Sequence, residues 1–197
     1  QRALLLLISH NPGRLLPTIR SRCQTLRLEP LKASCLVNWL LARAPDEPIK
    51  ELEIVSFLAE GSIGRALELI ELGGVSIYTD IMTLLESAPN IDTSSLHAFA
   101  SKLASKKGID NFKLTGELIR WILARIIKFS ARYDGQELSV EEQALFEKIV
   151  GSSSLDRWLN VWENVDGLLA SADSANLDRK QVLLNTFSFI SQASAAP

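Results

Sequence analysis

Arginines near the amino terminus are the side chains of this sequence most suited to chemistry. The segment from Gln1 to Leu28 carries five arginines and no acidic residue. Within it, the polar stretch Thr18–Cys23 follows a short apolar run from Ala3 to Ile8. A guanidinium group stays charged and spreads its donors over several phosphate oxygens. A hydrophobic strand that ends in a polar turn and then presents arginines predicts one edge of a phosphate-handling site.

The elements around these arginines are predicted to be short. Residues 3–9 form an apolar run of strand length without alternation, which is typical of a strand buried on both faces of a parallel sheet. The turn residues of 10–13 end it. Arg14 to Arg22 is expected to form one or two helical turns, and the alternating segment Gln24 to Leu28 predicts a second short strand.

The sequence after Leu28 predicts helices almost throughout. Three short ones are expected at residues 32–43, 49–60 and 62–72, with Gly61 as a C-cap and Ser62 as an N-cap. They are expected to form a compact three-helix bundle. Six further helices are expected at about 75–87, 93–106, 110–133, 139–150, 154–171 and 177–193.

The predicted helix from Phe112 to Tyr133 is the longest and most apolar. It carries apolar side chains on nearly every side. Such a helix is either central in its bundle or has a second face that meets a partner. On the second alternative, Trp121 becomes a candidate interface residue. Arg125, Lys128 and Arg132 share a basic stripe of this helix and become candidates for contact with DNA or an acidic neighbouring subunit.

The composition of the chain limits the number of domains and the class of protein. At 197 residues, with 47% hydrophobic and 22% charged residues, the chain fits one large or two small domains of ordinary character. A net charge of -2 argues against a nonspecific nucleic-acid binder. Two cysteines and two histidines without metal-ligand spacing predict neither a metal site nor a disulfide framework, and they favour a reducing cytoplasm. Because the sequence begins inside an apolar run without Met, we expect a fragment of a longer protein.

These patterns together resemble a known family. A strand, a polar turn, the Ser21-Arg22-Cys23 motif, a second strand and a three-helix bundle are similar to the bacterial clamp-loader family of DNA polymerase III, and most to its delta-prime type. The resemblance implies that Arg22 is an arginine finger that reaches the ATP of a neighbouring subunit. Ser21 and Cys23 would fix its turn. Ser9, His10 and Asn11 would lie at the sensor-1 position.

A second motif departs from the pattern of the ATP-hydrolysing members of the family. Those members carry a sequence similar to Gly-Ser-x-Arg-x-Ala. Its arginine is the sensor 2, which contacts the nucleotide bound by the same subunit. Here Gly64 stands at that position and Arg65 follows it. Because one helical residue is about 100° of rotation, Arg65 is expected to point away from such a site. The departure favours the non-hydrolysing delta-prime type over the gamma/tau ATPase.

The resemblance implies a mainly α fold with three parts. Residues 1–29 would be the end of an AAA+ core, a short α/β remnant. Residues 30–73 would be a three-helix lid, and residues 74–197 an all-helical collar that assembles the complex. Its partners would be the gamma/tau and delta subunits and, indirectly, the sliding clamp and primed DNA. The resemblance also places ATP and Mg²⁺ in the neighbouring subunit. The given residues contain no Walker A sequence, so no catalysis is expected from this chain alone, while a copy upstream stays open.

Other interpretations of the same residues stay open at this stage. Taken alone, Arg22 would favour a surface salt bridge or a helix C-cap, and the surrounding motif favours the finger. Arg20, two residues away, is a weaker candidate for an interface. Cys23 has no paired histidine and is expected to be a small buried packing residue. The alternative functions are a gamma/tau ATPase fragment and a plain helical interaction or DNA-binding protein.

Overall fold

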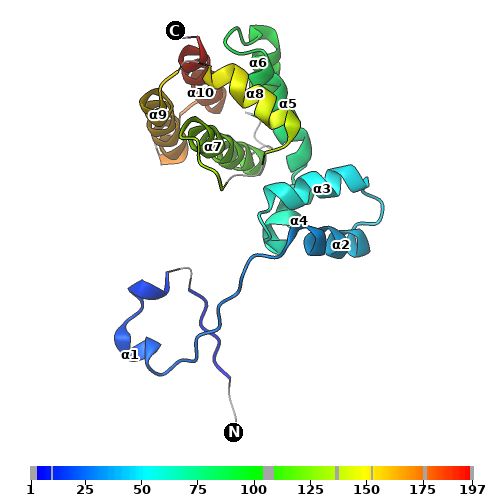
Figure 1. The fold of residues 1–197 in the computed structure, drawn as a ribbon, viewed down its shortest axis with the longest axis vertical. Helices are drawn as coiled ribbons and strands as arrows, with labels where there is room; N and C mark the ends of the chain where they lie inside the picture. The colour runs from blue at the N-terminus through cyan, green and yellow to red at the C-terminus, as the bar shows by residue number, and fades with distance from the viewer. Residues whose placement is uncertain are drawn as a thin grey trace.

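A computed structural model describes residues 4–9, 11–103, 109–135, 138–151, 153–174 and 177–195. Three parts follow one another along the chain (Figure 1). Residues 4–9 and 11–30, here called the arm, extend away from the rest and contain only the 3-10 helix η1 (Pro12–Arg14) and the single-turn helix α1 (Pro17–Arg20). A three-helix bundle comes next, and a six-helix bundle completes the described chain.

The three-helix bundle contains α2 (Ala33–Arg43), α3 (Ile49–Leu58) and α4 (Ile63–Glu71). Leu36 and Leu40, one turn apart on α2, are fully buried, as the helical spacing predicts. The Ser62 hydroxyl accepts a hydrogen bond from the Arg65 amide at 3.3 Å, so its predicted role as N-cap is confirmed. Gly61 has a φ of +80°, which is the left-handed conformation expected of a glycine after a helix.

The six-helix bundle contains α5 (Gly74–Glu86), α6 (Thr93–Leu103), α7 (Ile109–Ser130), α8 (Val140–Val150), α9 (Leu155–Ser174) and α10 (Arg179–Ser194). All six lie close to their predicted positions. Helix α7 packs against α5, α6, α8 and α9, and nine of its described residues are buried. Most of its apolar surface is therefore covered within this chain, which favours the central helix of the two alternatives, and a face that meets a partner stays a prediction. Gly116 lets α9 approach closely, because a Cβ there would lie 3.3 Å from a methyl carbon of Leu169.

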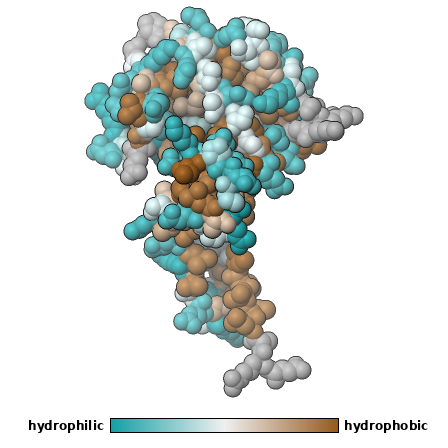
Figure 2. All heavy atoms as spheres, turned by 90° about the vertical axis from the view of Figure 1, so that its right-hand side faces the viewer, coloured by the Kyte–Doolittle hydropathy of each residue, from teal (hydrophilic) through white to brown (hydrophobic). Residues whose placement is uncertain are grey.

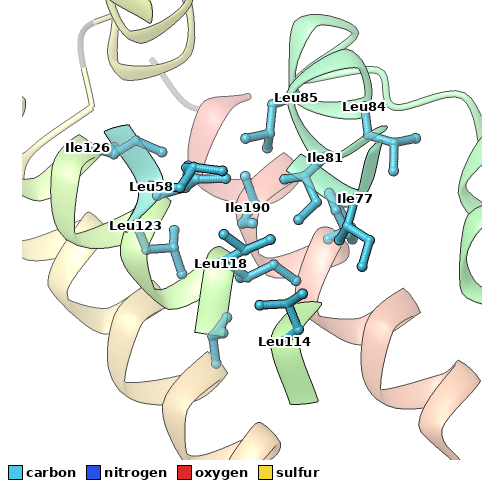
Figure 3. Packing of buried hydrophobic residues seen from close by; sticks show 14 of the residues in the cluster. Leu58, Ile77, Ile81, Leu84, Leu85, Leu114, Leu118, Leu123, Ile126 and Ile190 are labelled. Carbon is cyan, nitrogen blue, oxygen red and sulfur yellow. The ribbon is translucent and has the colours of Figure 1, made fainter. Parts of the chain in front are cut away.

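The hydrophobic core is continuous from one bundle into the other. Leu58 of α3 belongs to the same buried cluster as Ile77 and Ile81 of α5 and Leu123 and Ile126 of α7 (Figure 3). Shared burial of this kind favours a fixed arrangement of the two bundles, because separating them would expose apolar surface to water. Whether residues 30–73 and 74–197 are separate domains stays a prediction.

The arm differs from the prediction of an α/β remnant. Residues 4–9 and 24–28 form no strand, and large apolar side chains such as Leu5 and Ile8 are 82% and 91% exposed. Figure 2 shows much brown, hydrophobic surface on the arm below the bundles, beside teal, hydrophilic side chains. Both predicted strands are therefore wrong for this structure, as is the expected burial of the apolar run. A strand needs neighbouring strands for its ladder, and the described residues supply none here.

None of the helices in the described part of the chain is long and apolar enough to cross a membrane. The same residues contain no group of three or more histidine, cysteine or acidic side chains that could hold a metal ion.

Candidate functional site

Arg22 lies on the outer part of the arm, just after α1. The short helix brings the Arg22 amide within 3.1 Å of the Ile19 carbonyl, and the Ser21 hydroxyl donates to the Thr18 carbonyl at 3.3 Å. The Arg22 side chain is exposed, and its guanidinium forms no hydrogen bond or ion pair with another described residue. The turn therefore holds the backbone of Arg22, and no other described residue pairs with its guanidinium.

The neighbours of Arg22 are also exposed. Ser21 contributes to the turn through its hydroxyl, which donates to the Thr18 carbonyl. Cys23 is exposed, so the prediction that it is a buried packing residue is wrong for this structure. Its burial would require surrounding apolar groups, and the described part of the arm leaves it facing solvent. Arg20, the last residue of α1, is exposed as well.

The predicted sensor-1 residues lie at the beginning of the arm. Ser9 is half-buried, and Asn11 is exposed and accepts a hydrogen bond from the Arg14 amide at 3.1 Å. His10 lies outside the described residues. Within the described part, no hydrogen bond joins Ser9 or Asn11 to Arg22.

Gly64 and Arg65 lie at the beginning of α4 and face different surroundings. Gly64 is exposed, and a Cβ added there would meet nothing within 4 Å, so packing does not demand a glycine. The Arg65 guanidinium donates to Glu68 at 3.0 Å and pairs with Glu117 of α7. Arg65 is thus directed toward the six-helix bundle and ties α4 to α7.

Trp121 is half-buried where the two bundles meet. Its Nε1 donates to the Glu60 carboxylate at 2.9 Å. The ring of Phe57 meets it edge-on, with centroids 5.2 Å apart. Trp121 was predicted as a candidate for an external interface. In this structure it joins α7 to the end of α3.

Arg125 also lies inside this junction. Its guanidinium carbon is 4.7 Å from the ring centroids of both Phe57 and Trp121. Its Nε and Nη2 donate to the two carboxylate oxygens of Glu142 at 3.1 and 2.9 Å. The Arg125 and Glu142 side chains are only 12% and 3% exposed. A bidentate, buried pair of this kind is an internal contact, so the predicted basic stripe is reduced to Lys128 and Arg132.

Lys128 and Arg132 are exposed at the carboxyl end of α7. The Tyr133 amide donates to the Lys128 carbonyl at 3.0 Å, and the Arg132 amide donates to the Phe129 carbonyl at 2.9 Å. With a φ of 54° at Arg132, this is a Schellman C-cap with arginine where glycine is usual. A hollow of about 570 Å³ beside it is lined by Arg132, Asp134 and Glu147 among others. Acidic and basic groups both line the hollow, so its charge selects no clear ligand class.

Four residues that complete the junction were not singled out from the sequence: Glu60, Tyr78, Glu117 and Glu142. The pKa of Tyr78 is raised far above its usual value, first by burial and then by the nearby negative charge of Glu142. Glu142 had a detectable signal, because it forms a capping box with Ser139 three residues earlier. Glu60 and Glu117 had none, since their partners are distant in the sequence.

The amino-terminal residues match known subunits of DNA polymerase III. A family model described as DNA polymerase III, delta subunit, matches residues 1–32. The DNA polymerase III subunit delta' of Pseudomonas aeruginosa is 48% identical over 59 residues. That match covers 30% of this chain and 18% of the relative's length. No solved structure matches the chain. Over this short stretch, the findings support a clamp-loader subunit of the delta-prime type.

Proposed function

We propose that this chain is the carboxyl-terminal part of a non-hydrolysing delta-prime-like subunit of the DNA polymerase III clamp loader. Arg22 acts in trans on ATP and Mg²⁺ held by a neighbouring subunit. An arginine in this position neutralises charge that develops on the transferred phosphoryl group. The chain performs no catalysis alone, but it belongs to a DNA-directed DNA polymerase holoenzyme, a nucleotidyltransferase.

One observation carries this proposal. The structure leaves the Arg22 guanidinium exposed on the arm, without a hydrogen bond or ion pair to the other described residues. Arg125 is the opposite case, because its guanidinium is paired with Glu142 inside the chain. An arginine finger must be able to approach a second subunit, and of these two arginines Arg22 meets that condition.

The surroundings of Gly64 support the non-hydrolysing assignment. The exposed glycine leaves room for a larger side chain, so space alone does not explain the missing sensor-2 arginine. Arg65 does not replace it, because its guanidinium is paired with Glu68 and Glu117. On this proposal the subunit contributes to a neighbour's ATP site and does not turn over ATP of its own.

The remaining parts of the chain would serve assembly. Residues 30–73 act as the lid of an AAA+ core, of which residues 1–29 are the end. Residues 74–197 act as the collar, through which the subunit joins gamma/tau and delta. The assembled complex loads the sliding clamp onto primed DNA in the cytoplasm.

The test is the substitution Arg22→Ala in the full-length subunit, reconstituted with its partner subunits. We expect the complex to assemble normally while ATP turnover at the site served by Arg22 falls by roughly 10³-fold, the lower range for arginine fingers in GTPases. The total ATP turnover of the complex then falls only by the fraction that this one site contributes. Arg27→Ala is the matched control, because Arg27 is an exposed arginine of the same arm outside the motif.

Two results would contradict the proposal. Wild-type ATP turnover with Arg22→Ala in a fully assembled complex would rule out Arg22 as an arginine finger. An equal loss with Arg27→Ala would show that the general positive charge of the arm matters and that Arg22 has no special position.

A further inference from the structure

The end of α3 has an unusual backbone. Glu60 and Gly61 are consecutive residues with positive φ, at 48° and 80°. A left-handed conformation is common for glycine and uncommon for a residue with a side chain such as glutamate. Residues held in such conformations persist where their surroundings enforce them, and they cluster at functional positions. The contacts of both residues therefore need an explanation beyond ending a helix.

Gly61 holds the end of the arm. Its carbonyl accepts a hydrogen bond from the Leu31 amide at 3.0 Å. A Cβ on Gly61 would lie 2.5 Å from the Leu31 carbonyl oxygen and 2.6 Å from the Leu31 nitrogen. The backbone that leads out of the arm thus passes so close to this turn that only glycine fits.

Glu60 holds the six-helix bundle. Its left-handed conformation accompanies a hydrogen bond at 2.9 Å from Trp121 Nε1 to its carboxylate. The Trp121 ring is fixed in turn by Phe57 and by the guanidinium of Arg125. Two adjacent residues therefore bind the arm on one side and α7 on the other.

Other contacts keep the two bundles together around this turn. Arg65 of α4 pairs with Glu117 of α7. The Asn111 side-chain amide of α7 donates to the Leu72 carbonyl at 3.0 Å. These contacts lie on α4 and its end, while Glu60 follows α3, so the three-helix bundle is tied to α7 at several separate points.

We propose that the Glu60–Gly61 turn is a positioning device, which sets the direction in which the arm leaves the helical bundles. Glu60 and Gly61 act through other residues and touch no nucleotide. The inference rests on the proposed function in one respect: the direction of the arm decides where Arg22 meets the neighbouring subunit. If the turn were only a helix stop, glycine at position 60 would serve at least as well as glutamate.

The test measures the direction of the arm without using ATP turnover. Spin labels are attached to Arg14→Cys on the arm and Val140→Cys on α8, both exposed positions, in a full-length subunit whose other cysteines are replaced by serine. Pulsed electron paramagnetic resonance then gives the distribution of label distances. Glu60→Gln keeps an oxygen acceptor for Trp121 and should leave the distribution narrow. Glu60→Gly keeps the turn and removes the acceptor, and it should broaden the distribution.

Two further variants guard against misfolding. Trp121→Phe retains an aromatic ring against Phe57 but loses the N–H donor, so it should broaden the distribution as Glu60→Gly does. Gly61→Ala should shift or broaden it because of the clash with Leu31. An unchanged distribution in folded Glu60→Gly and Trp121→Phe, as judged by circular dichroism, would overturn the inference.

ATP turnover of the reconstituted complex separates this inference from the proposed function. Glu60→Gly should lower kcat by roughly 10–100-fold with little change in KM, because a displacement of about 1 Å can cost 10²-fold in rate. Glu60→Gln should keep the ATP turnover close to that of the wild type. A broadened distribution with wild-type kcat would overturn the positioning role. Wild-type turnover with Arg22→Ala would instead overturn the finger, whatever the labels report.

Discussion

The arm and helix α7 have similar side chains but opposite surroundings. Both contain large aliphatic residues and at least two arginines. Leu5 of the arm is 82% exposed, while Leu118 of α7 is 1% exposed. Arg22 is unpaired among the described residues, while Arg125 is held by Glu142 and two aromatic rings. The difference shows that residue type alone does not decide between a structural and an outward-facing role. The decision depends on what the rest of the chain places beside each residue.

The two arginines give the largest expected contrast in stability. Arg125→Ala leaves the Glu142 carboxylate buried without its partner, so we expect a loss of about 3–5 kcal/mol in the free energy of unfolding. Arg22→Ala should change it by less than about 0.5 kcal/mol, because the side chain is exposed. Urea denaturation followed by circular dichroism measures both. Equal effects of the two substitutions would break the comparison.

The two leucines give the next contrast. Leu118→Ala removes a buried side chain from the core and should cost about 2–5 kcal/mol of unfolding free energy. Leu5→Ala should change it by less than about 0.5 kcal/mol in this 197-residue chain. The same denaturation experiment applies. A cost above 2 kcal/mol for Leu5→Ala in this chain would show that the arm is packed in solution.

The smallest expected effect concerns helix ends. Asp92 precedes α6 and accepts a hydrogen bond from the Ser95 amide at 2.8 Å, whereas α1 of the arm has no side-chain cap. Hydrogen bonds from Ser95 lower the pKa of Asp92, so its contribution is present above the unfolded pKa of about 4 and is lost as pH falls through the lower folded pKa. Asp92→Ala should therefore lower the melting temperature at pH 7.

The pH dependence provides the control for this cap. The difference in melting temperature between wild type and Asp92→Ala should shrink as the pH falls below about 4. Asp92→Asn keeps an oxygen acceptor and should behave more like wild type at pH 7. A difference that stays constant down to the lowest measurable pH would argue against a role of the ionised carboxylate.

The helical part of the fold could be predicted from the sequence, because its signals are local. Ser62 and Gly61 mark helix ends by their own backbone and side-chain chemistry. The apolar surface of α7 likewise indicated a helix that is either central or covered by a partner, and the structure places it among α5, α6, α8 and α9. The strands could not be judged in the same way. A strand depends on partners from other segments, and the apolar run at residues 4–8 has none among the described residues.

The residues of the candidate site differ in the same way, between those with local sequence signals and those with distant partners. Arg22 and Ser21 could be proposed from the sequence because their motif is contiguous. The junction residues Glu60 and Glu117 were missed because they contact Trp121 and Arg65 across 61 and 52 positions of the sequence. Arg125 was assigned to an external stripe for the same reason, since its partner Glu142 lies on the next helix. Charge patterns on one helix do not reveal which neighbour will cover them.

The most direct test of the central claim is chemical rescue of Arg22→Ala. ATP turnover of the reconstituted complex is measured with increasing guanidinium chloride, below denaturing concentrations, and with urea as an uncharged molecule of similar shape. If Arg22 supplies its cation to a neighbour's phosphates, guanidinium should restore turnover in a saturable manner, and urea should not. Equal effects of guanidinium and urea, or wild-type turnover of Arg22→Ala without either, would contradict the account.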